Sequence, residues 1–314
     1  MEASNFFSIV LLQIMTFVVY ALVGVYAVKK NIIAKDGLGV LSAFIIKIAL
    51  PTMIFIYTLN GATKEQFIQS LSVLGAGALM FGCLLAIGVA ASTLFKLNYN
   101  EKQVYRACTM FGNVGFMGIP ILLAVLPERG MLYMSLFTIV DQLSLWTIGL
   151  TLCTPEKASN SMSLQQKLLK MINPATIAII SATILIFAGV KLPLFLNTAL
   201  MKIGNSATPL ALAYLGGMFA LMDISAYVKR AEIYLAVVLK MVLFPIVFCH
   251  ILKLTGINSE IVLTVSILSA MPSMSSIPMI AQSQGSAGEY AAGMVFITTV
   301  CFIFTLPLVS LFIG

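Results

Sequence analysis

Two charged side chains lie far from the ends of long apolar stretches in this sequence. Asp141, which Gln142 follows directly, is midway along residues 130–153, and Lys240 lies within residues 232–253. A charge at the centre of a membrane helix costs at least about 2.5–3.5 kcal/mol, so such residues predict a functional site. Asp141 fits either a proton or cation site or a structural partner satisfied by Lys240 or by backbone. Lys240 fits either a contact with exposed helix carbonyls, in place of a bound sodium, or a structural ion pair.

Two further basic side chains have less demanding positions. Lys47 lies one turn before Pro51 in another apolar stretch, where its long side chain can extend to the cytoplasmic face. His250 is the only histidine, and it lies near one end of its apolar stretch. A proton-carrying role is open for His250, but packing or an interfacial position is the simpler interpretation.

Two other apolar stretches carry residues that interrupt helices. They read Met110-Phe-Gly-Asn-Val-Gly-Phe-Met-Gly-Ile-Pro120 and Ala270-Met-Pro-Ser-Met-Ser-Ser-Ile-Pro278. Glycine costs about 1 kcal/mol and proline about 3 kcal/mol inside a helix, and freed backbone groups at membrane depth need protein or a water-filled cavity as partners. We therefore expect both helices to be broken near their middle and to face each other, although a close-packing glycine face with proline kinks is the alternative.

Broken helices offer groups that suit an anion. Half-helices starting near the two prolines would present free N–H groups and a positive dipole end to a carboxylate. The preceding halves would present carbonyls that suit a cation or a lysine. Uncharged polar side chains lie at the same level. The expected substrate-binding residues are Asn113, Gly115, Gly118, Pro120, Ser273, Ser275, Ser276 and Pro278.

The sequence lacks the residue patterns of an enzyme, a metal site or a nucleotide cofactor. Its histidine has no Gly-x-Ser-x-Gly partner, and Asp141 is the only deep aspartate, whereas intramembrane aspartyl proteases need two. No Walker motif, no Gly-x-Gly-x-x-Gly and no zinc-ligand spacing occurs. The five cysteines are isolated from one another, which argues for free, packed thiols. We therefore expect no catalytic residue, no metal and no cofactor.

Composition assigns the whole chain to the lipid bilayer. Apolar residues make up 60% and charged residues 9%, whereas soluble domains carry roughly 25% charged residues. Apolar stretches of about 20 residues, the length that crosses a bilayer, leave no room for a soluble domain. The net charge of +7 reflects loop residues and indicates no nucleic-acid partner. The ten expected spans are 5–28, 37–59, 67–95, 104–126, 130–153, 172–190, 195–221, 232–253, 260–282 and 287–313.

The distribution of lysine and arginine predicts the orientation. Eleven lie on one side: Lys29, Lys30, Lys35, Lys96, Lys102, Arg106, Lys157, Lys167, Lys170, Lys229 and Arg230. Four lie on the other: Lys64, Arg129, Lys191 and Lys253. The positive-inside rule places the first set in the cytoplasm. Both termini are then expected outside the cell membrane.

An internal repeat is expected from the positions of the helix-breaking residues. An offset of 158 residues pairs Pro51 with Pro209, Asn100 with Asn258, Pro120 with Pro278, and Gly130 with Gly288. Because each half holds five spans, an odd number, the halves must be inverted relative to one another, as in alternating-access transporters. The expected units are a first five-helix repeat at 1–153, a short cytoplasmic linker at 154–171 and a second five-helix repeat at 172–314.

These motifs resemble those of a known transporter family. The pattern Asn113-x-Gly115-x-x-Gly118-x-Pro120 resembles the fourth-helix motif of the auxin efflux carrier family, which includes plant PIN carriers and bacterial malate or malonate permease-like proteins. Lys240-Met-Val-Leu-Phe-Pro245 and the closing stretch that ends in Thr305-Leu-Pro307 are similar to that family too. The resemblance covers the whole chain. The ninth span has Ser-Met-Ser-Ser where plant carriers often have Asn, which argues against auxin as the substrate.

The resemblance implies an all-helical fold like that of sodium/proton antiporters and bile acid symporters. There, two broken helices cross in a mobile domain beside a scaffold domain. Spans 1, 2, 6 and 7 would form the scaffold of a homodimer in a bacterial inner membrane, and spans 3–5 and 8–10 the transport domain. The expected function is secondary active or facilitated transport of a mono- or dicarboxylate, with Asp141, Gln142 and Lys240 as coupling or charge-setting residues. The alternatives are a passive anion channel and, further removed, an intramembrane enzyme.

Overall fold

The structure, a computed structural model, consists of helices and short connections over residues 3–61, 63–156 and 174–314, which are the residues it describes. Long apolar runs form helices because a helix satisfies its own backbone hydrogen bonds in lipid. The one strand-like pairing in these ranges is an isolated antiparallel bridge between Gly112 and Ser273. Most of the predicted linker at 154–171, with Lys157, Lys167 and Lys170, lies outside the described residues.

Six helical stretches in the described part of the chain are long and apolar enough to cross a membrane. Three shorter apolar helices accompany them. The chain is therefore an all-helical, multi-pass membrane protein. The long stretches are Phe7–Lys29, Asp36–Gly61, Ser72–Thr93, Gly130–Leu152, Ala231–Lys253 and Gly288–Ile313, and the shorter ones are Val114–Val125, Pro174–Ala188 and Ser259–Ser269.

The helices of the first half precede the undescribed residues 157–173. They are α1 (Ala3–Lys29), α2 (Lys35–Phe44), η1 (Ile45–Ala49), α3 (Leu50–Gly61), α4 (Lys64–Gln69), α5 (Ser72–Thr93), α6 (Tyr99–Met110), η2 (Val114–Gly118), α7 (Ile119–Val125), α8 (Gly130–Ser144), η3 (Leu145–Gly149) and α9 (Leu150–Leu152). The label η marks a π-helical turn.

The helices of the second half follow the undescribed residues 157–173. They are α12 (Pro174–Ala188), α13 (Leu194–Asn205), α14 (Ala207–Leu221), α15 (Ser225–Val228), α16 (Ala231–Ala236), η4 (Val237–Leu243), α17 (Phe244–Lys253), α18 (Ser259–Ser269), α19 (Ile277–Ser283) and α20 (Gly288–Ile313).

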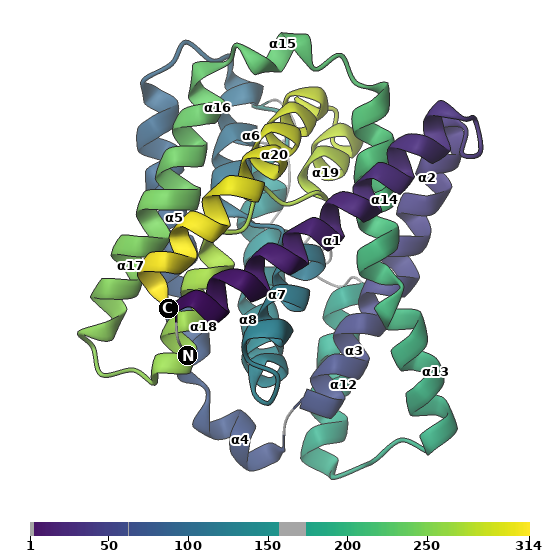
Figure 1. Cartoon of the computed structure of the whole chain (residues 1–314), viewed down its shortest axis with the longest axis vertical. Helices are drawn as coiled ribbons and strands as arrows, with labels where there is room; N and C mark the ends of the chain where they lie inside the picture. Colours follow the sequence, from purple (N-terminus) through teal and green to yellow (C-terminus); the bar gives the residue numbers. More distant parts are fainter. Residues whose placement is uncertain (1–2, 62, 157–173) are drawn as a thin grey trace.

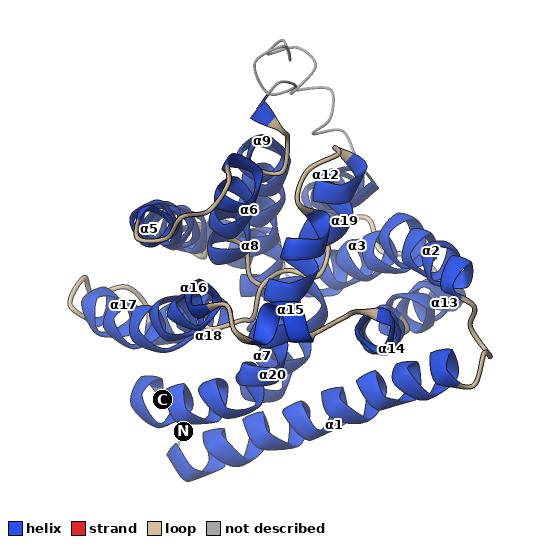
Figure 2. Ribbon diagram, turned by 90° about the horizontal axis from the view of Figure 1, so that it is seen from above, coloured by secondary structure: helices blue, strands red, loops and turns tan. Residues whose placement is uncertain are grey.

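The helices fall into two side groups with a set of helices between them. In both views α2, α3, α13 and α14 lie on the right, and α5, α16 and α17 lie on the left (Figures 1 and 2). Between these groups lie α7, α19 and α20. The contacts agree with this division, since α3 packs on α12 and α13 whereas α5 packs on α6 and α8.

The long helices α1 and α14 approach each other with their backbones in contact. A Cβ atom on Gly24 of α1 would lie 1.8 Å from the carbonyl oxygen of Ala213, and one on Gly216 of α14 would lie 1.9 Å from that of Ala21. The contact between α1 and α14, the helix seam, is therefore formed by two small residues, three positions apart, on each helix. Van der Waals packing of this kind holds membrane helices together, because there is no hydrophobic driving force between helices in lipid.

Two predicted boundaries differ from the observed ones for identifiable reasons. The span expected at 104 begins at Tyr99, because the side chain of Asn98 accepts a hydrogen bond from the N–H of Glu101 at 2.8 Å and caps the helix. Such a cap extends a helix into polar sequence. The span expected from 67 starts at Ser72, and a separate short helix, α4, precedes it.

Candidate functional site

Two helices are interrupted, and the interruptions cross each other. One break lies between α6 and η2 and the other between α18 and α19, where the sequence predicts them. The N–H of Asn113 donates to the carbonyl of Pro272 at 2.7 Å, and the N–H of Met274 donates to that of Phe111 at 3.1 Å. Each broken helix thus supplies partners for the backbone groups that the other has freed, which is what membrane depth requires.

The second half of the first broken helix begins earlier than the sequence predicts. The half-helix was expected to start near Pro120, but it starts at Val114 as a π-helical turn. The carbonyl of Asn113 accepts from the N–H groups of Met117 at 3.1 Å and Gly118 at 3.2 Å. Pro120 therefore lies inside the half-helix, and the extended residues before Val114 form the break. In the other broken helix the second half does begin at the expected proline.

Lys240 binds the carbonyl end of the first broken helix. Its Nζ donates to the carbonyls of Cys108 and Phe111, both at 2.8 Å, and the side chain is only 1% exposed. Of the two alternatives for this lysine, the contact with exposed carbonyls is the observed one. The ammonium lies against the negative end of a half-helix, where a positive charge is stabilised. Among the ion pairs of the described residues, none joins Lys240 to Asp141.

A cavity of about 90 Å³ lies beside the crossing. This inner cavity is lined by residues from the start of η2, the middle of α8, η3, η1 and the segment just before α19. Its wall is mostly apolar, with a few convergent polar groups, the usual composition of a small-molecule site. The polar residues and glycine on its wall are Asn113, Gly115, Thr138, Asp141, Gln142, Trp146 and Ser276.

Two residues on this wall each have a buried side-chain polar atom without a hydrogen-bond partner among the described residues. These atoms are the Nδ2 of Asn113 and the Oδ1 of Asp141, on side chains that are 1% and 2% exposed. The other carboxylate oxygen of Asp141 accepts from the Nε2 of Gln142 at 2.9 Å, and Gln142 in turn accepts from the Nε1 of Trp146 at 3.2 Å. A buried donor and a buried acceptor thus remain available to a ligand, and unpaired groups of this kind are rare without a role.

The remaining predicted residues do not line the inner cavity. Ser273 holds the crossing together, since its hydroxyl donates to the carbonyl of Cys108 at 2.9 Å. The hydroxyl of Ser275 is buried and unpartnered away from the cavity. A Cβ on Gly118 would lie 2.8 Å from the side chain of Leu268, so this glycine permits close packing. Pro278 is buried at the start of α19. Lys240 binds the carbonyl of Phe111 at the break and does not line the cavity.

The other two basic residues singled out from the sequence lie at the surface. Lys47 is exposed on η1, as expected of a side chain that extends toward the membrane surface. His250 is exposed on α17, with its Nδ1 2.8 Å from the carbonyl of Ile246. Neither residue lines the inner cavity.

The π-helical turns of the described residues gather around this site. Residues of η1, η2 and η3 line the inner cavity, and η4 carries Lys240. Such turns are rare and occur often at functional sites. Sequence reasoning missed them and also the position of Trp146 on the cavity wall. The position of Trp146, four residues after Gln142 on one helix face, is the signal that could have identified it.

A second cavity, of about 200 Å³, lies on the other side of Ile119. This outer cavity is bounded by α1, α3 and the start of α14, and Pro120 lies on its wall. Its polar side chains include Gln13, Thr16 and Tyr57. Ile119 is 4% exposed and lines both cavities, so this one side chain and its neighbours separate them.

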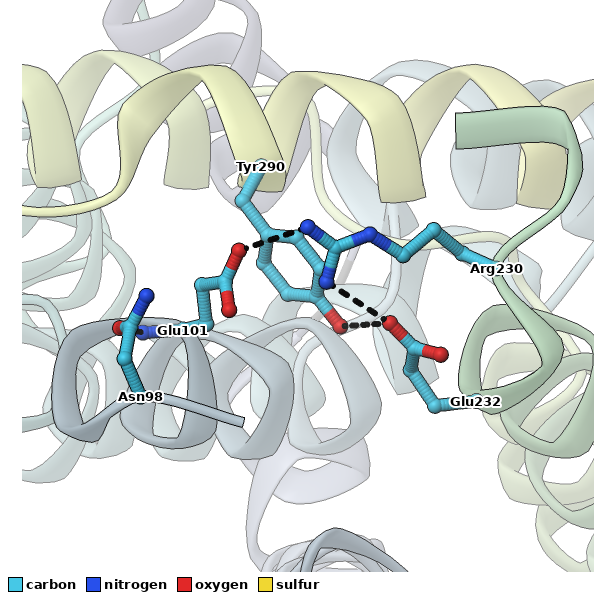
Figure 3. A network of polar contacts seen from close by, with 5 residues as sticks. All are labelled: Asn98, Glu101, Arg230, Glu232 and Tyr290. Carbon is cyan, nitrogen blue, oxygen red and sulfur yellow. Dashed lines mark hydrogen bonds and ion pairs between the residues drawn. The ribbon is translucent and has the colours of Figure 1, made fainter. Parts of the chain in front are cut away.

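A polar cluster anchors the start of α6 (Figure 3). Arg230 donates to Glu101 at 2.9 Å and to Glu232 at 3.2 Å, and its guanidinium lies 5.2 Å from the centre of the Tyr290 ring. The hydroxyl of Tyr290 contacts Glu232 at 3.4 Å. The cluster therefore ties the connection before α16 to both α6 and α20.

A similar cluster anchors the start of α18. Its carboxylate, Glu260, accepts from the hydroxyl of Tyr133 at 2.7 Å and lies 3.5 Å from the guanidinium of Arg129. The side chain of Asn258 caps the helix by accepting from the N–H of Glu260 at 2.8 Å. In Figure 1 the connection between α17 and α18 lies at the lower end of the molecule, whereas α15 lies at the upper end.

Comparison with known proteins identifies a family for this chain. Residues 9–310 match the family described as "Membrane transport protein". A "Putative malonate transporter" of Rhizobium meliloti is 24% identical over 277 residues, which are 84% of this chain and 83% of that protein. The "Uncharacterized transporter YfdV" of Escherichia coli is 21% identical over 302 residues, 94% and 95% of the two chains.

An archaeal protein extends the comparison. The "Uncharacterized transporter MJ1031" of Methanocaldococcus jannaschii is 24% identical over 210 residues, 65% of this chain and 67% of that one. All these relatives are named as transporters and none as an enzyme. With a family match over nearly its full length, this chain belongs to the auxin efflux carrier family of membrane transport proteins.

Proposed function

We propose that this protein carries a small organic anion, a mono- or dicarboxylate, across the membrane by alternating access around its two crossed broken helices. The inner cavity beside the crossing carries the proposal. It offers the unpartnered Nδ2 of Asn113 together with Gly115 and Phe116, which belong to the first turn of a twelve-residue apolar helix. The N–H groups of a first turn have no acceptor within the helix, and together with the helix dipole they suit a carboxylate.

The size of the inner cavity favours a small substrate. Its volume of about 90 Å³ is space for roughly six waters if each needs about 15 Å³, or for a carboxylate of a few heavy atoms. The name of the Rhizobium meliloti relative makes malonate the first compound to test. Ser276 adds a hydroxyl to the same wall.

The proposed architecture is ten spans in two inverted five-helix repeats. The two polar clusters support it, because each combines a helix-capping asparagine, a glutamate, a tyrosine and an arginine at the start of a broken helix. The separations of three matched pairs are close to the 158 that relates Pro120 and Pro278. They are 160 for Asn98 and Asn258, 159 for Glu101 and Glu260, and 157 for Tyr133 and Tyr290.

The two cavities on either side of Ile119 suit alternating access. In this scheme α1, α3, α12, α13 and α14 belong to the static scaffold, and the crossed helices move against them. Substrate would reach the inner cavity from one side of the membrane and the outer cavity from the other side. Ile119 would keep the two cavities separate. A homodimer through the scaffold, a bacterial inner-membrane location and extracytoplasmic termini complete the proposal. Native mass spectrometry in mild detergent tests the dimer.

Counterflow in proteoliposomes tests the function. Vesicles loaded with unlabelled malonate should accumulate external labelled malonate transiently, because a carrier exchanges substrate across the membrane. Acetate, pyruvate, succinate and malate form the comparison panel. A passive channel, the alternative, gives flux that does not saturate and no transient accumulation. Asn113→Ala should reduce counterflow at least tenfold, and unchanged counterflow in that variant would contradict the assigned site.

A further inference from the structure

The inner cavity holds a carboxyl group where an anion is proposed to bind. Asp141 presents its unpartnered Oδ1 on the same wall as the unpartnered Nδ2 of Asn113. Among the described residues, no cationic side chain lines this cavity, and Lys240 is engaged with carbonyls behind the break. A buried charge is costly unless it is paired. A bound anion and an ionised Asp141 would therefore place two negative charges in one apolar-walled space.

The surroundings favour one negative charge in this cavity. The first turn of the helix at Val114–Val125 points its positive end at the cavity, and Gln142 donates to Asp141. These groups stabilise either an ionised Asp141 in the empty site or a bound carboxylate beside a protonated Asp141. In the second case the carboxyl O–H donates to the substrate and Asn113 donates to it as well, so both unpartnered atoms gain partners.

We propose that Asp141 is the proton site of this transporter and that one proton accompanies each anion. This inference rests on the proposed function of the inner cavity. The proton binds to Asp141 on the side where the anion enters, and the anion and the proton leave together on the other side. The empty carrier returns with Asp141 ionised. With a monoanionic substrate the cavity thus holds one negative charge in both directions, and the only bond made and broken is the carboxyl O–H.

The other titratable groups near this helix do not face Asp141. Within the described residues, the elements packed against α8 are α3, α4, α5, α7, α12, α18 and η3. Their titratable groups, with the lysine of the adjacent turn η1 and the tyrosine of α8 itself, all lie off the inner cavity: Lys47, Tyr57, Lys64, Glu65, Cys83, Tyr133 and Glu260. Asp141 is the titratable group on the cavity wall.

The single tryptophan of the chain provides a binding test that needs no transport. Trp146 lines the cavity and is linked to Asp141 through Gln142. In the purified full chain, Trp146 emission should change with pH in the wild type and stay flat in Asp141→Asn. Malonate affinity read from the same emission should fall by up to about tenfold per pH unit on the alkaline side. In Asp141→Asn any remaining pH dependence of malonate affinity comes from the titration of malonate itself, so the difference between wild type and variant reports the titration of Asp141.

Transport measurements distinguish proton coupling from other roles of the Asp141 carboxylate. An inward proton gradient should drive the wild type to concentrate labelled malonate. Asp141→Asn, which cannot release a proton, should lose this accumulation, and any counterflow that it retains should not respond to the proton gradient. Asp36→Asn, an exposed aspartate on α2, is the matched control and should behave as wild type.

Two results would overturn the proposal: proton-driven accumulation by Asp141→Asn, or wild-type accumulation that follows a sodium gradient and ignores pH. A wild type that binds and exchanges no malonate at any pH would instead contradict malonate transport. The pH response of Trp146 would in that case still decide the role of Asp141, because a flat response in the wild type overturns the proposal.

Discussion

Replacing Lys240 by methionine should abolish or strongly reduce anion transport and leave the protein folded. The ammonium of Lys240 is the positive charge at the carbonyl end of the first broken helix. That end carries a partial charge of about −0.5 from the helix dipole. Without the ammonium this negative end is uncompensated, and it lies close to the cavity in which the anion is proposed to bind.

The expected loss of stability is small because two large contributions oppose each other. Hydrogen bonds to charged groups contribute about 1.5–3 kcal/mol each, so the two bonds of Lys240 contribute about 3–6 kcal/mol. Burying the ammonium costs several kcal/mol, and methionine avoids that cost. Both carbonyls keep a second donor, the hydroxyl of Ser273 for Cys108 and the N–H of Met274 for Phe111. The net change should be about 0–2 kcal/mol.

The expected loss of transport follows from distance. Lys240 binds the carbonyl of Phe111 at 2.8 Å, and Asn113 follows two residues later, which adds at most about 7 Å. At about 10 Å and an effective dielectric constant of about 20, a unit charge stabilises an anion by about 1.7 kcal/mol. Losing this stabilisation weakens anion binding about fifteenfold.

Counterflow of labelled malonate by reconstituted Lys240→Met measures the effect, and thermal melting in detergent confirms the fold. Lys47→Met is the matched control, since Lys47 is an exposed lysine on another π-helical turn, and it should transport normally. Lys240→Arg should retain part of the activity, because it keeps the charge in a bulkier, planar group. Normal transport by Lys240→Met would refute the reasoning. So would a wild-type uptake that collapses when choline replaces sodium, because a sodium ion would then supply the charge.

Three further substitutions probe the helix seam, the division between the cavities and the polar clusters. Gly24→Val should unfold or strongly destabilise the protein, because its Cβ would lie 1.8 Å from a backbone oxygen of α14, whereas Gly82→Ala, with open space around it, should melt as wild type. Ile119→Ala should join the two cavities and raise downhill leak of malonate from loaded vesicles; an unchanged leak would place the barrier elsewhere. Arg230→Gln should cost about 1–3 kcal/mol in a denaturant titration, because it leaves a buried carboxylate unpaired, whereas Arg129→Gln at a 55% exposed site should cost under about 1 kcal/mol.

The breaks in the helices could be predicted from the sequence because their cost is local. Glycine and proline are unfavourable in any helix interior, so their clustering near Asn113 and near Ser273 locates both breaks without knowledge of the fold. The contact of Lys240 with carbonyls follows in a similar way from the cost of burying a charge. A buried ammonium needs acceptors, and a broken helix in the same bundle is where free carbonyls are found.

The exact start of the second half of the first broken helix could not be predicted, because it depends on the segment that pairs with it. Val114 begins a half-helix once Asn113 is paired with Pro272, a residue distant in sequence. The same pairing decides which serine reaches the inner cavity. In the extended segment, neighbouring side chains point to opposite sides. Ser273 consequently faces the crossing while Met274 faces the cavity.

Asp141 and Lys240 are separated in the structure, and the sequence does not reveal this separation. The sequence identifies Asp141 and Lys240 as the two deep charges, and an ion pair between them is the simplest way to neutralise both. The structure instead places them on different sides of the break, one against carbonyls and the other on a cavity wall. A lysine bound to carbonyls leaves its positive charge to act on the site, and a carboxyl without a cation can release and bind a proton. In the proposed mechanism, separation of the two charges therefore makes anion binding and proton coupling compatible in one cavity.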